Sequence, residues 1–240
     1  MSNPKLIEES IDNLIRISND ERELDGYFHP SSACGPCIRR AVLEQWKTEP
    51  TNPAGLAAKR VMQMGTVMHE WVQDAIWRHP DVEVFYPEIS LEHEQLRLKG
   101  SADGLIVLTD GSTELAELKT IKSTAMKYGL PKEEHKIQAR LYALMLAEAG
   151  GEAGNGLLVL PTKVDRIRYF YLGKDNFVMN ESVEVLEDRT LNEMRNYMVL
   201  MNRLSDKEDM DALPRLGKSW YTNYCPYKGS GFCCGDFRKD

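Results

Sequence analysis

The chain has 240 residues, of which 42% are hydrophobic and 8% aromatic, as is typical of a globular protein that buries a substantial core. Its formal net charge of -7 argues against a protein that coats nucleic acid, because such binding depends on many lysine and arginine contacts to phosphate. No run approaches the roughly 20 apolar residues of a membrane span, and the N-terminus lacks the pattern of a signal peptide, so we expect a cytoplasmic protein without membrane contact.

Helical patterns dominate the first third of the chain. Apolar residues recur at helical spacing in residues 4–18, and the sequence IRRAVLEQW predicts a second helix over 38–46. Residues 51–80 predict a long helical stretch with a break near Gly65 and an end at Pro80.

The pattern changes to short β-type runs between Val82 and Thr120. Three runs read VEVFYPEISL, LRLKGSADGLIVL and TELAELKTI, separated by the polar EHEQ and by a turn at Asp110-Gly111. Alternating runs that are joined by turn signals predict a three-stranded meander.

A helix is expected next over 133–150, where apolar residues again recur at helical spacing before Gly150-Gly151. GLLVLP and RIRYFYL predict two further strands, and a long helix is expected from about Asn180 to Ser205. Because no repeat or Pro/Ser-rich linker divides the chain, we expect a single α/β domain over residues 1–240, with a helical N-terminal part and a cysteine-bearing C-terminal tail.

Two acids and a lysine interrupt the apolar β-type runs. Glu117 and Lys119 share one face of their strand by alternation, and the turn brings Asp103 on the partner strand close to Glu117. Two carboxylates a few Å apart repel one another unless a cation lies between them, and Mg²⁺ prefers such oxygen ligands. Lys119 could then orient or help to deprotonate a water molecule and neutralise charge on a phosphate. The alternative is an ordinary cross-strand salt bridge on a solvated sheet face.

Positive charge is concentrated around and after this motif. Its lysines and arginines are Lys119, Lys122, Lys127, Lys132, Lys136, Arg140, Lys163, Arg166 and Arg168. Beside an acidic pair, such a cluster indicates a local basic groove for DNA, and a solvated face is the alternative.

Several short motifs occur in a characteristic order along the chain. They are GTVMH with His69, PEISL with Glu88, GSAD with Asp103, ELK with Glu117 and Lys119, and KIQARLYA with Gln138 and Tyr142. Over roughly residues 31–234 this series resembles the RecB-like branch of the PD-(D/E)XK nucleases. The family name calls for Pro before the Asp, where this chain has Ala102, at a position that varies within the branch.

The resemblance implies a restriction-endonuclease-like α/β fold, with a central mixed β-sheet flanked by helices. It implies that Asp103 and Glu117 bind Mg²⁺ or Mn²⁺, that His69 is a further ligand or positions one, and that Lys119 acts on the attacking water. Glu88 joins this catalytic set.

The same resemblance implies a DNA substrate. An exonuclease that processes single-stranded or duplex DNA ends in recombination or repair is favoured over an endonuclease. Gln138 and Tyr142, four residues apart on one helix face, would contact DNA or brace the site, and Lys122 would contact DNA.

The five cysteines lie in two groups, Cys34 and Cys37 near the start and Cys225, Cys233 and Cys234 near the end. In a chain without an export signal, this grouping indicates metal ligation more than disulfides. A shared centre would join residues 31–45 to residues 220–240 and close a very long loop.

Several RecB-like nucleases, including those of CRISPR adaptation and AddB-type repair, hold a 4Fe-4S cluster with one cysteine before the nuclease core and three after it. The resemblance implies such a cluster on Cys37, on Cys225 and on Cys233 or Cys234, with Cys34 as a further candidate. Seven residues separate Cys225 from Cys233, which departs from the usual tight spacing. A Zn²⁺ site with two cysteines from each group is the rival interpretation, and reduced cysteines without metal are the third.

Two functions from other classes remain open. One is a catalytically silent DNA-binding subunit that works with a partner protein in a recombination complex. The other is a zinc-stabilised interaction module, for which the cysteines would suffice and the acids would be incidental.

Overall fold

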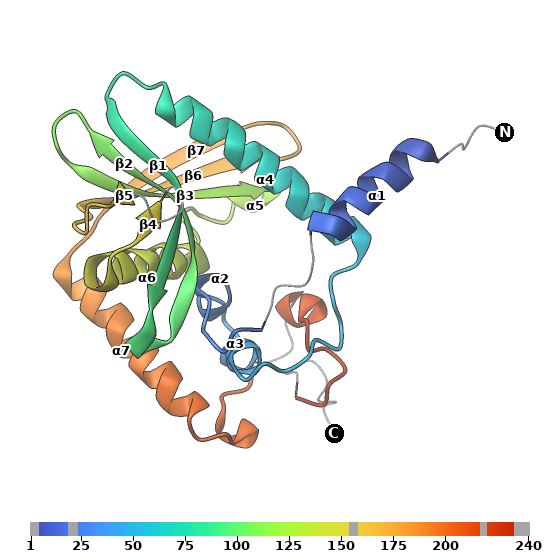
Figure 1. Cartoon of the computed structure of the whole chain (residues 1–240). Coiled ribbons are helices and arrows are strands. Elements are labelled where there is room, and N and C mark those ends of the chain that lie inside the picture. The colour runs from blue at the N-terminus through green and yellow to red at the C-terminus, as the bar shows by residue number, and fades with distance from the viewer. Residues whose placement is uncertain (1–4, 19–23, 154–157, 217–219, 233–240) are drawn as a thin grey trace.

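A seven-stranded mixed β-sheet forms the centre of the protein (Figure 1). The computed structural model describes residues 5–18, 24–153, 158–216 and 220–232. Its strands are β1 (Val82–His93), β2 (Leu98–Leu108), β3 (Thr113–Ile121), β4 (Glu152–Ala153), β5 (Leu158–Val159), β6 (Arg166–Gly173) and β7 (Met179–Val185). Their order across the sheet is β5-β4-β1-β2-β3-β6-β7, in which β3 and β6 are parallel.

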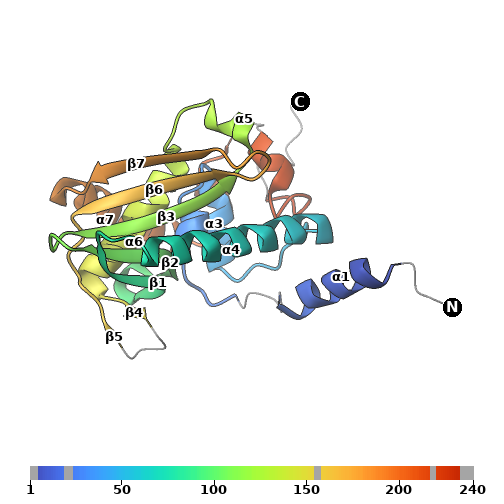
Figure 2. The same cartoon turned by 90° about the horizontal axis from the view of Figure 1, so that it is seen from above.

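Helices cover both faces of the sheet (Figure 2). They are α1 (Leu6–Ser18), α2 (Pro30–Ala33), α3 (Ile38–Gln45), α4 (Leu56–Trp77), α5 (Ser123–Met126), α6 (Glu133–Ala149) and α7 (Asp188–Ser205). The described 3-10 segments are η1 (Glu94–Leu96), η2 (Met210–Ala212) and η3 (Trp220–Tyr224). Helix α4 lies on one face, and α6 and α7 lie on the other. Among the residues described, no helix has the length and apolar character needed to cross a membrane.

The alternation of β3 divides its side chains between two apolar layers. Leu115 packs into the larger layer with α6 and α7, whereas Ala116 and Leu118 pack against Val72 and Ile76 of α4. Burial of a leucine side chain of this kind stabilises the fold by about 1.5–3 kcal/mol. Because side chains alternate along a strand, the residues at positions 117 and 119 share the face of Leu115 and point toward α6.

Helix α6 supplies most of the cover on that face. Its first turn carries Glu133 and Glu134, which favour the positive end of the helix dipole, and it ends at Gly150, whose φ of +75° suits glycine. Seven of its residues are buried between the sheet and α7. The helix belongs to the connection from β3 to the parallel strand β6, since parallel neighbours need a long crossover.

The expected α/β fold with a central mixed sheet flanked by helices is confirmed. The helices expected at 4–18, 38–46 and 133–150 are present as α1, α3 and α6. The meander is also confirmed, since β1, β2 and β3 are successive antiparallel neighbours. Gly111 has a φ of +83° in the turn between β2 and β3, a conformation that glycine adopts without a steric penalty.

Two expected elements differ from the structure. Helix α4 runs without a break through Gly65, where an added Cβ would lie 3.3 Å from the Thr120 Oγ1 atom. This glycine therefore permits a close approach of α4 to β3 and does not interrupt the helix. The long helix expected from about Asn180 is wrong in its first part, because Met179–Val185 pairs with β6 as an edge strand and α7 begins only at Asp188.

Candidate active site

Strands β2 and β3 separate at one end of their pairing. Their ladder runs from Val107↔Thr113 to Gly104↔Ala116, and the described residues of the two strands form no pair beyond that point. Asp103 and Glu117, the next residues on the two strands, stand at the opening, which we call the fork. The Leu118 amide donates a hydrogen bond of 2.6 Å to Asp103 Oδ2, so a side chain bridges the gap that the backbone ladder leaves.

Glu117 is a buried carboxylate, since only 1% of its surface is exposed. Lys119 forms an ion pair with it, and no other group of the described residues donates a hydrogen bond to its oxygens. Burial raises the pKa of Glu117 to about 7, the positive charge of Lys119 opposes this shift, and the negative charge of Asp103 adds to it. A buried carboxylate whose one partner is an ammonium group is costly, and its oxygens keep the capacity to bind a further cation.

Lys119 is the cation that this arrangement contains. Burial alone would lower the pKa of Lys119, but the negative charges of Glu117 and Asp103 outweigh it and raise the pKa above its usual value. The ammonium group therefore stays protonated at neutral pH. In this state it can stabilise negative charge or orient a water molecule, whereas it cannot accept a proton.

Asp103 differs from Glu117 in its electrostatics. Burial opposes ionisation, but the neighbouring His69, the positive charge of Lys119 and the hydrogen bond from the Leu118 amide together lower the pKa of Asp103. His69 Nδ1 of α4 lies 3.6 Å from Asp103 Oδ1. The fork thus holds one ionised carboxylate beside one whose pKa lies near neutrality, an arrangement found in sites that move protons.

Gln73 was not predicted from the sequence, and it ties helix α4 to two strands of the site, β1 and β2. Its Nε2 donates to Glu88 Oε1 at 2.8 Å and to the Asp103 backbone carbonyl at 2.9 Å. It follows His69 by four residues, so both side chains lie on the same face of α4. That spacing from a candidate histidine is the signal by which sequence reasoning could have found it.

Glu88 stands at an irregular point of β1. It lies between the pairs Pro87↔Gly104 and Ile89↔Ala102, and its φ is +47°. The left-handed region costs a residue with a Cβ about 1–2 kcal/mol. The exposed carboxylate accepts bonds from Gln73 and from Ser101 Oγ at 3.3 Å, so it lies at the margin of the fork.

Helix α6 brings Gln138 and Tyr142 toward the same face as Glu117. Tyr142 is only 4% exposed, and burial together with the charges of Glu117 and Asp103 raises its pKa, against a hydrogen bond from Gln138. An added Cβ at Gly100 would lie 3.1 Å from the Tyr142 ring. Of the two expected roles, its burial favours bracing the site over direct contact with DNA. Lys122 is exposed just before α5.

The residues at the fork fit a hard divalent cation in their donor chemistry. Apart from Lys119, no described group donates to the buried Glu117 oxygens, Asp103 is ionised, and His69 lies beside Asp103. Carboxylate oxygens are the ligands that Mg²⁺ prefers. Within the described residues, no three His, Cys, Asp or Glu side chains are arranged as a complete metal site. Any ion would therefore depend on two carboxylates with water or substrate.

The prediction that these lysines and arginines together form one basic groove is wrong. Arg166 and Arg168 both pair with Glu114, and Lys163 pairs with Asp165. Glu114 precedes Lys119 by five residues on β3, a distance of roughly 17 Å at about 3.3 Å per residue. These cations therefore lie toward the opposite end of β3 from Lys119, and the two arginines, by alternation, pair with Glu114 on the other face of the sheet, although Arg168 itself stands opposite Ala116 beside the fork. The exposed lysines near α5 follow the end of β3 that carries Lys119.

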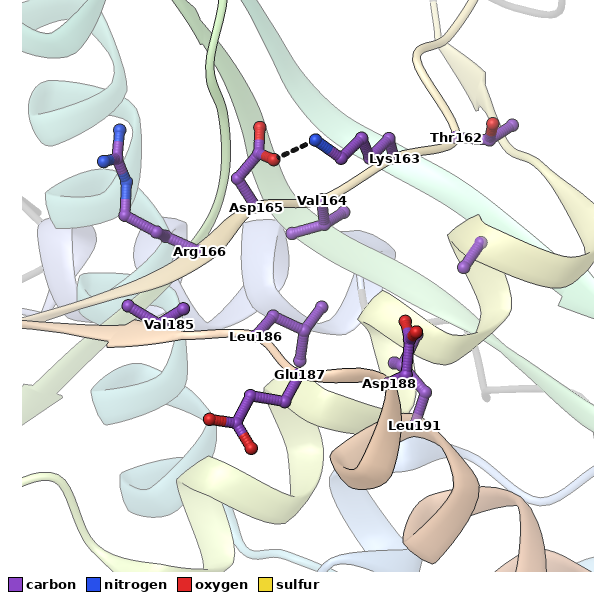
Figure 3. Close-up of a pocket in the computed structure, with 11 residues that line it drawn as sticks. Thr162, Lys163, Val164, Asp165, Arg166, Val185, Leu186, Glu187, Asp188 and Leu191 are labelled. Atoms are coloured by element: carbon purple, nitrogen blue, oxygen red, sulfur yellow. Dashed lines mark ion pairs between the residues drawn. The ribbon is translucent and has the colours of Figure 1, made fainter.

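A pocket of about 640 Å³ lies at that opposite end (Figure 3). Its lining includes Asp165, Arg166, Val185 and Asp188, and Lys163 points back to Asp165 in an ion pair. None of the residues at the fork lines it. The pocket therefore has no part in the candidate chemistry.

The cysteines that the structure describes, Cys34, Cys37 and Cys225, are all buried. Burial raises the pKa of Cys34 to about 12, so this thiol is protonated and unsuited to act as a nucleophile. Cys233 and Cys234 lie outside the described residues.

The N-terminal cysteine segment and the C-terminal tail nevertheless contact one another. Arg40 Nη1 donates to the Tyr221 hydroxyl at 3.2 Å, and Arg39 Nη1 donates to the Phe232 carbonyl at 3.4 Å. An added Cβ at Gly35 would lie 2.4 Å from the Tyr221 hydroxyl oxygen. The chain on either side of these contacts carries Cys34, Cys37 and Cys225, and Phe232 directly precedes Cys233.

Three solved structures share this fold. The structure of SSO0001 is 16% identical with a TM-score of 0.57, and the match covers 97% of this chain and 98% of that one. The structure of LHK-Exo in complex with dAMP is 16% identical with a TM-score of 0.52, and that of the alkaline exonuclease LHK-Exo from Laribacter hongkongensis is 14% identical with a TM-score of 0.51. Each LHK-Exo match covers 76% of this chain and 89% of the other. At these identities the likeness shows a common fold alone.

No curated protein sequence is detectably similar to the chain. The family model of the PD-(D/E)XK nuclease superfamily matches residues 27–231, which include the fork, the residues of α4 beside it and α6. This protein belongs to the PD-(D/E)XK nuclease superfamily.

Proposed function

We propose that this protein is a metal-dependent deoxyribonuclease that hydrolyses phosphodiester bonds at the fork between β2 and β3. The observation that carries the proposal is the buried pair of Glu117 and Lys119 beside the ionised Asp103, at the point where β2 and β3 cease to pair in a chain of this nuclease superfamily. A buried acid pair with a cation is costly to a fold and suits the handling of phosphate charge.

Asp103 and Glu117 would hold Mg²⁺ or Mn²⁺, and His69 would complete or orient this set. When bound, the ion would supply positive charge and Lewis acidity at the scissile phosphate. The chain's own contributions are separate from the ion. Lys119, held protonated by its two carboxylate neighbours, neutralises charge that develops on the phosphoryl oxygens and orients the attacking water.

Residues beside the fork position these groups. His69 orients Asp103 through their contact at 3.6 Å, and Gln73 fixes Glu88 relative to the backbone of Asp103. Gln138 and Tyr142 brace the fork from α6, while Lys122 contacts the DNA backbone.

Exonuclease action on DNA ends is favoured over endonuclease action. Two of the similar structures are of LHK-Exo, which is named an alkaline exonuclease, and one of them contains dAMP, a mononucleotide of the kind that an exonuclease releases. A role in recombination or repair, with a partner protein that delivers the DNA end, agrees with such an activity. We assign the activity to one nuclease domain that spans the chain.

The test is a Mg²⁺-dependent cleavage assay on linear and covalently closed circular DNA of the same sequence. We expect the linear DNA to be degraded to mononucleotides and the closed circle to remain intact. Nicking of the circle at a similar rate would replace the exonuclease with an endonuclease. If neither DNA were cleaved in Mg²⁺ or Mn²⁺ while the protein still bound DNA, the silent DNA-binding subunit would replace the nuclease.

We further propose that the terminal cysteines hold a 4Fe-4S cluster, as in the iron-sulfur members of the RecB-like branch. The proposal is supported by the contacts of Arg39 and Arg40 with the tail, because they bring both cysteine-bearing segments to one place. The ligands would be Cys37, Cys225 and one or both of Cys233 and Cys234, with Cys34 as the alternative.

Iron and zinc analysis of protein purified without oxygen tests this proposal. We expect about four iron atoms per chain with the visible absorbance of a cluster, and Cys37→Ser should lose both. One zinc per chain and no iron would establish the rival zinc site. A metal-free protein of unchanged stability would remove both, together with the zinc-stabilised interaction module.

A further inference from the structure

Two large aromatic side chains stand in solvent in segments that adjoin the end of β3 beyond Lys119. Tyr128, in the loop after α5, is 88% exposed, and Phe177, in the connection between β6 and β7, is 61% exposed. Aromatic side chains ordinarily bury most of their surface, because their rings gain from leaving water. Neither ring contributes in this way to the apolar layers of the fold.

The backbone of Phe177 is also unfavourable. Its φ is +59°, in the left-handed region where glycine or asparagine is expected and a bulky residue is an outlier. The fold therefore holds a phenylalanine in a strained conformation at a position where its side chain is not packed. Strain that the packing does not explain is a reason to look for a function.

Both aromatic residues are tied to the same end of β3. The Lys174 amide donates to the Ile121 carbonyl at 2.9 Å, two residues beyond Lys119. The Ser123 amide and hydroxyl donate to the two oxygens of Asp175 at 2.7 and 2.8 Å. These bonds join the start of α5 to the β6–β7 connection. Figures 1 and 2 show the two segments close together, where β3 and β6 end and β7 begins.

The same edge carries unpaired positive charge. Lys122, Lys127 and Lys174 are exposed, and none of them forms an ion pair within 4.0 Å with a described carboxylate. Asp175, the carboxylate between these segments, is engaged by its two hydrogen bonds from Ser123. Exposed aromatic rings can stack on the flat bases of an unpaired strand, and lysines beside them can bind its phosphates.

We propose that Tyr128 and Phe177 form a stacking platform for the bases of single-stranded DNA at the fork, with Lys122, Lys127 and Lys174 contacting its phosphates. This inference rests on the proposed nuclease function and specifies its substrate as an unpaired strand. Bases within a duplex are already stacked on their neighbours, so exposed rings can reach them only where the strand is unpaired.

The first experiment measures the binding of a fluorescent single-stranded oligodeoxynucleotide and of its blunt duplex, in EDTA so that no cleavage occurs. Base stacking is worth a factor of roughly 5 to 100 in Kd per base. We therefore expect Tyr128→Ala and Phe177→Ala each to weaken single-strand binding by at least about 5-fold, and to change duplex binding far less. Tyr128→Phe, which keeps the ring, should retain the affinity of the unmodified protein.

Trp77→Ala is the matched control. Trp77 is 60% exposed at the end of α4, just before β1, whose first residue pairs with Leu108 at the far end of the sheet from Ile121. Its removal also deletes an exposed ring, but it should leave both affinities unchanged. An equal loss in Trp77→Ala would overturn the platform, because the effect would then follow from ring removal anywhere on the surface.

A second variant separates function from structure. Phe177→Gly relieves the left-handed strain and loses little buried surface, so the melting temperature should stay the same or rise while single-strand affinity falls. A lower melting temperature with unchanged affinity would show that Phe177 serves the fold and would overturn the inference.

The outcome also distinguishes this inference from the proposed function. If the unmodified protein cleaves DNA and the alanine variants bind single strands as well as it does, the platform is wrong and the nuclease stands. If the unmodified protein neither binds nor cleaves DNA, both proposals fall.

Discussion

The amide of Leu118 donates a hydrogen bond of 2.6 Å to the carboxylate of Asp103, across the point where β2 and β3 cease to pair. One aspartate therefore serves two purposes. Its Oδ2 atom replaces a bond that the separated backbones lack, and its Oδ1 atom faces His69 at 3.6 Å. Asp103 thus joins β2 to β3 through its Oδ2 atom and leaves its Oδ1 atom facing the site.

Substitutions at Asp103 should separate these two purposes. Asp103→Asn keeps an oxygen acceptor for the Leu118 amide and relieves the repulsion of Glu117, so the free energy of unfolding should change by less than about 1 kcal/mol. Asp103→Ala leaves the amide unsatisfied and should cost about 1–3 kcal/mol. Both variants should lose cleavage, since both lack the charge that would hold a metal ion.

Urea unfolding and Mg²⁺-dependent cleavage of the two variants provide the measurement. Equal stability losses in both variants would show that the carboxylate charge, and not the acceptor oxygen, maintains the fork. Full cleavage by Asp103→Asn would remove this residue from the site.

Replacement of Lys119 should abolish turnover and leave the fold intact. Lys119→Ala removes the cation that opposes the raised pKa of Glu117, so this carboxylate should become protonated more readily. Loss of a group that stabilises transition-state charge typically lowers kcat by about 10²–10³. DNA binding in EDTA should change little, because one of several positive groups is lost.

Lys163→Ala is the matched control for this variant. Lys163 pairs with Asp165 at the opposite end of β3 and β6, and its side chain is 83% exposed. Its removal should leave kcat and KM unchanged. Cleavage by Lys119→Ala at the rate of this control would exclude the fork as the catalytic centre.

Gln73 should act as a positioning residue. Gln73→Met retains the length of the side chain but deletes its bonds to Glu88 and to the Asp103 carbonyl. Because these bonds fix the fork geometry and not the DNA, we expect kcat to fall by about 10-fold or more while KM changes little. Gln73→Glu, which adds a charge beside Glu88, should be worse than Gln73→Met. A pure stability role would instead lower the melting temperature and leave kcat per folded molecule unchanged.

The central part of the site follows from local rules. Alternation along β3 puts Glu117 and Lys119 on one side, and the glycine turn sets the register that brings Asp103 opposite Glu117. Both rules act over a few residues, so the sequence pattern is sufficient to predict them. The separation of the two strands at that point depends on the Asp103 side chain, and no periodicity reveals it.

Features that depend on distant partners escaped prediction. Residues 179–185 form a strand because β6 offers them an open edge, although the following helix suggested a helical start further upstream. Gly65 favours a helix break locally, but its close approach to Thr120 makes it part of the packing between α4 and β3. The division of the basic residues between two ends of the sheet likewise depends on Glu114, a buried carboxylate that attracts two arginines.

His135 should make the stability of the protein depend on pH. Burial and the positive charges of Lys119 and Lys132 lower its pKa from the usual 6.5 of a histidine to about 3, and its Nδ1 lies 2.8 Å from the Tyr171 hydroxyl. Between these two values the unfolded chain binds a proton that the folded protein excludes. Stability is therefore fully present above about pH 6.5 and is lost as the pH falls toward 3.

Urea unfolding of the unmodified protein and of His135→Gln at pH 7 and pH 5 measures this contribution. One excluded proton corresponds to at most about 1.4 kcal/mol per pH unit, so the unmodified protein should lose more stability than His135→Gln over this interval. His79→Gln, which removes an exposed histidine outside α6, is the control substitution. If His135→Gln and the unmodified protein lost the same free energy, the imidazole would titrate normally in the folded state, and the positive charge of Lys119 would not extend to α6.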